Sequence, residues 1–132
     1  TLRTEVIEMR EKMREHLGSK QTSDEESRVF HLKQDRGGIV DIEFMVQYLV
    51  LSQSPKHPEL VTWTDNIRIL DSVEEVGLLP AEDCELLREA YKAYRATGHR
   101  QSLQEQSAVI ADSEMREYRD AVERIWKGIM ER

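Results

Sequence analysis

The sequence contains a single cysteine, Cys84, so no disulfide can form within the chain. Asp83 and Glu85 flank it, and negative neighbours disfavour a thiolate, so we expect a buried or inert thiol in a reducing cytoplasm. Glycine and proline are also scarce, at 6 and 3 residues, whereas 34% of the residues are charged. This composition favours helices over strands.

Long apolar and basic stretches are missing as well. The longest apolar stretch, 39–51, contains Asp41, Glu43 and Gln47 and is shorter than the ~20 residues of a membrane-spanning helix. No Lys/Arg-rich run occurs and the net charge is −7, so we expect neither a membrane nor a nucleic acid as partner. One small nucleotide can still bind in a local basic pocket of such an acidic protein.

Known catalytic and metal-binding motifs are absent. The sequence has no Gly-x-Ser-x-Gly, Walker or His-Glu-x-x-His pattern. The four histidines have no metal-ligand spacing; they are His16, His31, His57 and His99. We therefore predict no catalytic residue and no metal site in this chain. The chain begins in an amphipathic pattern without Met, so we expect no signal peptide and a piece excised from a longer protein.

Apolar residues at helical spacing predict about five helices. The first covers 2–17, with Gly18 as the C′ residue, and is followed by a polar loop over 19–27. The second, 39–52, is apolar on most sides, which is typical of the buried centre of a bundle. The third covers 65–76, with Thr64 as N-cap and Gly77 as C′.

Pro80 suits the first position of a fourth helix that continues past Gly98 towards Gln104. A fifth helix begins near Asp112 or Ser113. Packing explains the presence of both tryptophans, Trp63 and Trp126. Residues 29–33 form a short extended segment that is too isolated to define a sheet. The predicted fold is an all-α bundle in a single domain, residues 1–132.

Residues 33–44 are the most unusual segment. Two adjacent glycines, Gly37 and Gly38, precede the buried helix, and they allow positive φ and close backbone approach. The unpaired N–H groups at the helix start, together with Lys33 and Arg36, can face a phosphate. The alternative is a tight turn in which Asp41 only complements the helix dipole.

Acidic side chains on this helix diverge. Asp41 and Glu43 project about 200° apart, so they cannot both ligate one ion. Glu43 and Gln47 share a face at i and i+4. On so apolar a helix, this pair either makes a structural hydrogen bond or ion pair inside the bundle or lines a wet cleft.

Residues 33–51, together with 9–18, 57–60 and 63–70, resemble the helical domain of bacterial glutamine synthetase adenylyltransferase, in its C-terminal, adenylylating half. After Pro80 the resemblance rests mainly on helical pattern. The related PII uridylyltransferase has a similar helical domain with a similar glycine pair, so the equivalent domain of that enzyme is an alternative.

The resemblance implies a parent nucleotidyltransferase that transfers an adenylyl group from ATP to a tyrosine of glutamine synthetase. It implies Mg²⁺ or Mn²⁺ as cofactor and control by the PII signalling protein and glutamine. The family's catalytic Gly-Ser and Asp-x-Asp motif lies in the preceding domain; here Gly18-Ser19 is followed by Lys20. We therefore expect no tightly bound cofactor and no activity in this chain alone.

In that context the helical domain helps to close the ATP cleft. The candidate nucleotide-binding residues are Lys33, Arg36, Gly37, Gly38, Asp41 and Glu43. Two other functions remain open. The bundle either docks PII or glutamine synthetase without a role in catalysis, or it is a structural spacer whose apolar face, on 2–17 or on 115–129, contacts a neighbouring domain.

Overall fold

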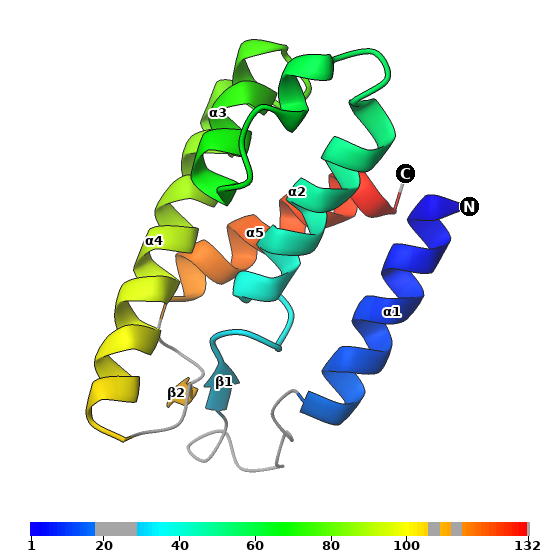
Figure 1. The fold of residues 1–132 in the computed structure, drawn as a ribbon. Coiled ribbons are helices and arrows are strands. Elements are labelled where there is room, and N and C mark those ends of the chain that lie inside the picture. Colours follow the sequence, from blue (N-terminus) through cyan, green and yellow to red (C-terminus); the bar gives the residue numbers. More distant parts are fainter. Residues whose placement is uncertain (18–28, 106–108, 112–114, 132) are drawn as a thin grey trace.

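Helices make up most of the chain in the computed structural model, which describes residues 1–17, 29–105, 109–111 and 115–131 (Figure 1). In chain order the elements are α1 (Leu2–Leu17), β1 (Val29–His31), α2 (Ile39–Gln53), the short 3-10 helix η2 (Pro58–Val61), α3 (Asn66–Glu75), α4 (Ala81–Leu103), β2 (Val109–Ala111) and α5 (Arg116–Met130). The predicted all-α bundle of about five helices is confirmed.

The second helix is the centre of the bundle. α2 packs against α1, α3, α4 and α5, and it lies between α1 and α4 with α5 crossing behind it (Figure 1). Its apolar side chains supply much of the core; Val40, Ile42, Met45, Val46 and Leu49 are buried. The prediction that this helix is central is confirmed, because a helix that is apolar on most sides needs neighbours on most sides.

The extended segment after α1 is paired. β1 and β2 form a two-stranded antiparallel sheet in which Phe30 lies opposite Ile110. The expectation of an isolated segment is therefore wrong, since the partner strand lies far along the sequence. Phe30 is fully buried; its ring packs 5.9 Å from that of Tyr94 and 4.0 Å from the guanidinium carbon of Arg119. The sheet thus joins the start of α2 to α4 and α5.

Three predicted helix ends need correction. The N-cap of α3 is Asp65 rather than Thr64, because the Asp65 carboxylate accepts hydrogen bonds from the backbone N–H groups of residues 67 and 68. Pro80 is the N-cap of α4 and not its first residue. α5 begins at Arg116, while Asp112 and Ser113 lie outside the described residues, as does Gly18.

Other ends are confirmed. Gly77 has φ +76° directly after α3, as a C′ glycine does. α4 continues through Gly98 to Leu103. Trp126 is buried, but Trp63 is 44% exposed, and its ring stacks on the Arg68 guanidinium at 4.5 Å. The prediction that packing explains both tryptophans therefore holds fully only for Trp126. No described helix combines the length and apolarity needed to cross a bilayer.

The first helix contributes least to the core. Its only fully buried residue is the charged Arg10, and Val6 and Ile7 are partly buried against the apolar core. α1 packs chiefly on α2. Polar contacts therefore hold α1 in place to an unusual degree, and they converge on the turn that opens α2.

Candidate functional site

The turn between β1 and α2 is fixed by local hydrogen bonds. The His31 N–H donates to the Asp35 carboxylate at 2.9 Å, and the Asp35 N–H donates to the His31 carbonyl at 3.2 Å. The Nδ1 atom of His31 accepts from the N–H groups of Lys33 and Gln34 at 3.3 and 3.2 Å. These bonds determine where the backbone of Lys33 lies before α2 begins.

The two glycines allow backbones to approach each other closely. Gly37 has φ +81°, and a Cβ atom there would lie 2.7 Å from the carbonyl oxygen of Arg119 on α5. A Cβ atom at Gly38 would lie 2.7 Å from the carbonyl oxygen of Leu32. Side chains are thus excluded at both positions by neighbouring backbone.

The backbone N–H groups at the start of α2 already have protein acceptors. The donors and their acceptors are Gly37 to the Asp41 carboxylate at 2.8 Å, Gly38 to the Asp35 carbonyl at 2.9 Å, Ile39 to the Leu32 carbonyl at 2.8 Å and Val40 to the Lys33 carbonyl at 3.1 Å. The expectation that N–H groups at the helix start are unpaired and face a phosphate is therefore wrong for residues 37–40. The turn folds back on its own carbonyls, so a ligand would depend on side chains instead.

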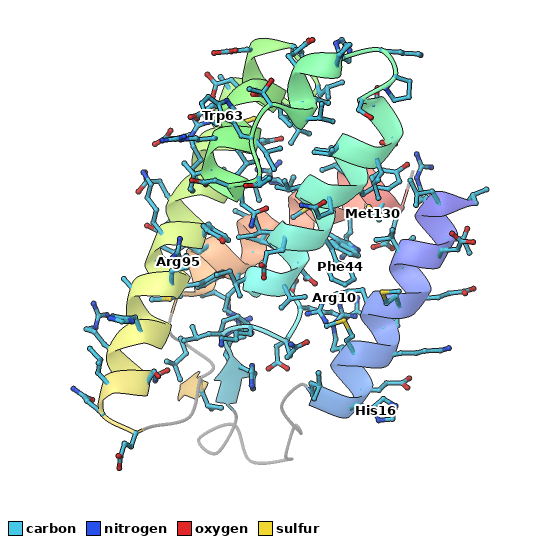
Figure 2. The ribbon with its side chains drawn as sticks, viewed as in Figure 1. Arg10, His16, Phe44, Trp63, Arg95 and Met130 are labelled. Atoms are coloured by element: carbon cyan, nitrogen blue, oxygen red, sulfur yellow. The ribbon has the colours of Figure 1, made fainter. Side chains whose placement is uncertain are left out.

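Asp41 connects this turn to α1. Its carboxylate is buried, accepts the Gly37 N–H, and lies 2.5 Å from Nε of Arg10 and 3.4 Å from Nη2 of Arg14. Arg10 also donates to the backbone carbonyl of Gln34. Burial lowers the pKa of Arg10, and the charge of Asp41 opposes that shift. Asp41 therefore holds the turn in place from inside the protein (Figure 2 shows Arg10 between α1 and α2).

Arg36 lies on the same side of the turn as Asp41. Its side chain is exposed, and Nη2 lies 3.4 Å from the Glu11 carboxylate of α1. It borders a depression of about 60 Å³ between the turn, α1 and α5; the other lining residues are Arg14, Asp41, Glu123, Trp126, Lys127 and Glu131.

A larger cleft lies on the opposite side of the turn, against α4. It has a volume of about 800 Å³ and is lined by Leu32, Lys33, Ile39, Glu43, Tyr91, Tyr94, Arg95, Ala96, Gly98, His99 and Ser102. Burial raises the pKa of Glu43, and the charges of Lys33 and Arg95 oppose that rise. Glu43 therefore lies in the wall of a cleft, whereas Gln47 is exposed and borders a different groove, beside α1.

The structure places two of the six candidate residues on each side of the turn and two in the turn itself. Lys33 and Glu43 line the large cleft, whereas Arg36 and Asp41 border the depression beside α1. The buried pair Gly37 and Gly38 belongs to the turn that separates the two sides. The predicted divergence of Asp41 and Glu43 is confirmed by their different neighbours, because two positions on a helix turn about 200°.

Sequence reasoning missed the residues that α4 contributes to the cleft. Tyr91, Arg95, His99 and Ser102 recur at spacings of four, four and three on α4, and they line the cleft together. This spacing is a usable signal, since it places side chains on one helix face. Among the described residues, no group of three or more His, Cys, Asp or Glu side chains is arranged to hold a metal ion.

Comparison with known proteins gives consistent matches. A family model described as GlnD PII-uridylyltransferase matches residues 7–109. The chain is 56% identical over 133 residues, covering 96% of its length, to a bifunctional glutamine synthetase adenylyltransferase/adenylyl-removing enzyme of Pseudomonas syringae pv. tomato. Proteins with the same name from Pseudomonas aeruginosa and Acinetobacter baylyi are 52% and 44% identical, over 97% and 98% of the chain.

The chain spans 14% of the length of each of these three relatives. The similarity extends over nearly the whole chain, including the residues after Pro80, where the sequence motifs themselves carried little information.

Proposed function

This chain belongs to the GlnD PII-uridylyltransferase family, whose model matches residues 7–109, and we propose that it is the helical domain of a longer adenylyltransferase. The name shared by its relatives favours adenylyl transfer from ATP to glutamine synthetase over uridylyl transfer to PII. In this proposal the domain helps to close the ATP cleft. The catalytic carboxylates, with Mg²⁺ or Mn²⁺, belong to a preceding nucleotidyltransferase domain, and PII is a regulatory partner.

The placement of Lys33 carries the proposal. Lys33 borders a cleft of about 800 Å³, and hydrogen bonds on both sides of it hold its backbone. Nucleotidyl transfer depends on positioning and on stabilising negative charge as it develops on phosphate. Because the backbone of Lys33 is fixed, only its side chain has to order when it meets a phosphate, and this arrangement suits one wall of a nucleotide cleft.

The other candidate residues have supporting roles in this proposal. Gly37 lets the turn pack against α5, and Gly38 lets the turn fold closely onto its own carbonyls. Asp41 fixes the turn to α1 through Arg10. Arg36, on the far side of the turn, adds to the positive field rather than contacting the same phosphate. ATP itself fits the side chains of the cleft, since lysine and arginine are the usual partners of phosphate oxygens.

Replacing Lys33 in the longer enzyme tests the proposal. Lys33→Ala is expected to lower kcat/KM for adenylylation of glutamine synthetase by about 10- to 100-fold, because a charge-assisted contact to phosphate is lost. Lys33→Arg is expected to retain part of the activity. Steady-state kinetics with ATP as the varied substrate provide the measurement.

The matched control is Lys56→Ala, which removes the same charge from the turn at the other end of α2. It is expected to leave kcat/KM within about twofold. Circular dichroism of each variant checks that the fold is intact. If Lys33→Ala and Lys56→Ala have equal kinetics, the domain does not form this wall of the cleft.

A protein-docking function is the second candidate, and an apolar groove favours it. The groove between α1 and α2 has a volume of about 310 Å³ and is lined by Leu2, Glu5, Val6, Met9, Phe44, Gln47, Tyr48 and Leu51. Met9 and Leu51 are each 59% exposed, which is unusual for large apolar side chains outside an interface.

Titration of this chain with PII, with glutamine synthetase and with ATP separates the two candidates. Binding of either protein that is lost in Leu51→Glu, without any binding of ATP, would favour the docking module. Self-association that is lost in the same variant would instead indicate that the groove is an interface within the longer protein.

A further inference from the structure

The large cleft has a charge that differs from that of the rest of the protein. The chain as a whole has 26 acidic and 19 basic residues, yet the cleft lining contains Lys33 and Arg95 with only one carboxylate, Glu43. A locally positive cleft in an acidic protein attracts anions, because its low-dielectric walls concentrate the field of the two cations.

The two cations keep free hydrogen-bonding capacity. Within the described part of the chain, neither Lys33 nor Arg95 forms a salt bridge, and the guanidinium carbon of Arg95 lies 5.6 Å from the centre of the Tyr91 ring. Arg95 is on α4 (Figure 2), whereas Lys33 is on the turn before α2. The cations therefore come from two different walls of one cleft.

Two further polar side chains extend this surface along α4. His99 lies one helical turn after Arg95, and Ser102 lies nearly one turn after His99; both line the cleft. An imidazole and a hydroxyl can each donate a hydrogen bond to a phosphate oxygen. The donors thus follow the helix axis over a length that suits a chain of phosphates better than a single ion.

Glu43 is the opposing charge in this cleft. It is half-buried and interacts electrostatically with both Lys33 and Arg95, without a salt bridge to either one in the described structure. A single carboxylate cannot neutralise two cations, and its negative charge repels any anion that enters. Glu43 therefore lowers the affinity of the cleft for an anion without abolishing it.

We infer that this cleft is an oligophosphate site in which Arg95 and Lys33 bind the phosphate chain from two walls, His99 and Ser102 donate further hydrogen bonds, and Glu43 competes with the ligand for the cations. This inference rests on the proposed function and deepens it, because it assigns the second wall of the same cleft. The ligand chemistry is shared by the triphosphate of a nucleotide and by an inorganic oligophosphate.

Binding to the 132-residue chain tests the site directly. Isothermal titration calorimetry with sodium tripolyphosphate at low ionic strength is expected to give a Kd of about 1 mM or tighter. Arg95→Ala is expected to weaken binding by about tenfold, because it removes a charge-assisted contact. Glu43→Gln, which keeps the shape of the side chain, is expected to strengthen binding by about fivefold.

The matched control is Lys92→Ala, which removes one positive charge from α4 at an exposed position outside the cleft lining. It is expected to change the Kd by less than about twofold. The inference is overturned if tripolyphosphate does not bind, if Lys92→Ala weakens binding as much as Arg95→Ala does, or if Glu43→Gln fails to strengthen it. Arg95 and Lys92 are both exposed, so neither variant is expected to unfold.

Parallel titrations with ATP and with adenosine identify the source of the phosphate. Tighter binding of ATP than of tripolyphosphate means that the nucleoside also contacts the cleft, whereas equal affinities mean that only the phosphate chain is bound. The two proposals can fail separately. If the chain does not bind tripolyphosphate but Lys33→Ala lowers the activity of the longer enzyme, this inference is rejected and the proposed function stands. If the chain binds tripolyphosphate but Lys33→Ala leaves that activity unchanged, the proposed function is rejected.

Discussion

Gly37 is required for two separate physical reasons. Its φ of +81° lies in the left-handed region, and a Cβ atom would lie 2.7 Å from the Arg119 carbonyl oxygen. Gly77 has a similar φ of +76°, but a Cβ atom there would meet nothing within 4 Å. Comparing Gly37 with Gly77 therefore distinguishes the cost of a positive φ from the cost of a clash with a neighbouring backbone.

Alanine substitutions at both positions test this separation. Gly77→Ala is expected to lower the free energy of unfolding by about 1 kcal/mol, the cost of a left-handed non-glycine residue. Gly37→Ala is expected to lower it by about 3 kcal/mol or more, because the turn must also move away from α5. Urea denaturation provides both values. Equal losses would show that the contact with Arg119 does not constrain Gly37.

At the scale of elements, α1 is attached to the bundle mainly through charge. Arg10 is 0% exposed and pairs with the buried Asp41, and Arg14 approaches the same carboxylate. A buried pair is a weak source of net stability, but removing one partner is costly because the other stays buried. The same contacts orient the turn that carries Lys33, so the position of α1 and that of the cleft wall are linked.

Breaking this pair is expected to cost far more than breaking an exposed one. Arg10→Met should lower the free energy of unfolding by about 3 kcal/mol. Arg124→Met, which removes the exposed side chain that contacts Asp83 at 3.0 Å, should cost less than about 1 kcal/mol. Hydrogen exchange is expected to accelerate first in α1 of the Arg10 variant. Uniform acceleration over all helices would contradict a local role for this pair.

For the molecule as a whole, the reactivity of the Cys84 thiol indicates whether the core is folded. It is 0% exposed in the core that α3 and α4 share with the other helices, and burial raises the pKa of its thiol to about 11. The thiolate is the reactive form, so the folded protein protects this group both by covering it and by keeping it protonated. The expectation of a buried thiol is confirmed.

Alkylation of Cys84 by iodoacetamide is therefore expected to require unfolding of the bundle. At pH 8 the native chain should react slowly and the urea-denatured chain rapidly, with Gly37→Ala intermediate. The raised pKa also predicts that stability is complete below the unfolded value of about 8.5 and falls as the pH rises towards 11, because the unfolded thiol ionises first. Equal alkylation rates of native and denatured chains would contradict this protection.

The sequence by itself determined the helices and the class of fold. Apolar spacing is a local property, so the bounds of 2–17 and the central position of 39–52 could be predicted without any knowledge of neighbours. The divergence of Asp41 and Glu43 also followed from helix geometry alone, as did the need for a special backbone at the glycine pair. The cap of α3 was misplaced by one residue, because Thr64 and Asp65 are both good caps.

Tertiary structure decided what each of these elements meets. Three features bring together residues far apart in the sequence. They are the pairing of β1 with β2, the burial of Arg10 beside Asp41 and the placement of Lys33 and Arg95 around one cleft. The N–H groups of the glycine turn were expected to be free, yet the fold supplies their acceptors from residues 32–35 and from Asp41. The periodicity of apolar residues in a sequence describes one element at a time, whereas a cleft is formed by two elements in contact. Only the packed chain could therefore show that α4 forms the second wall of the large cleft.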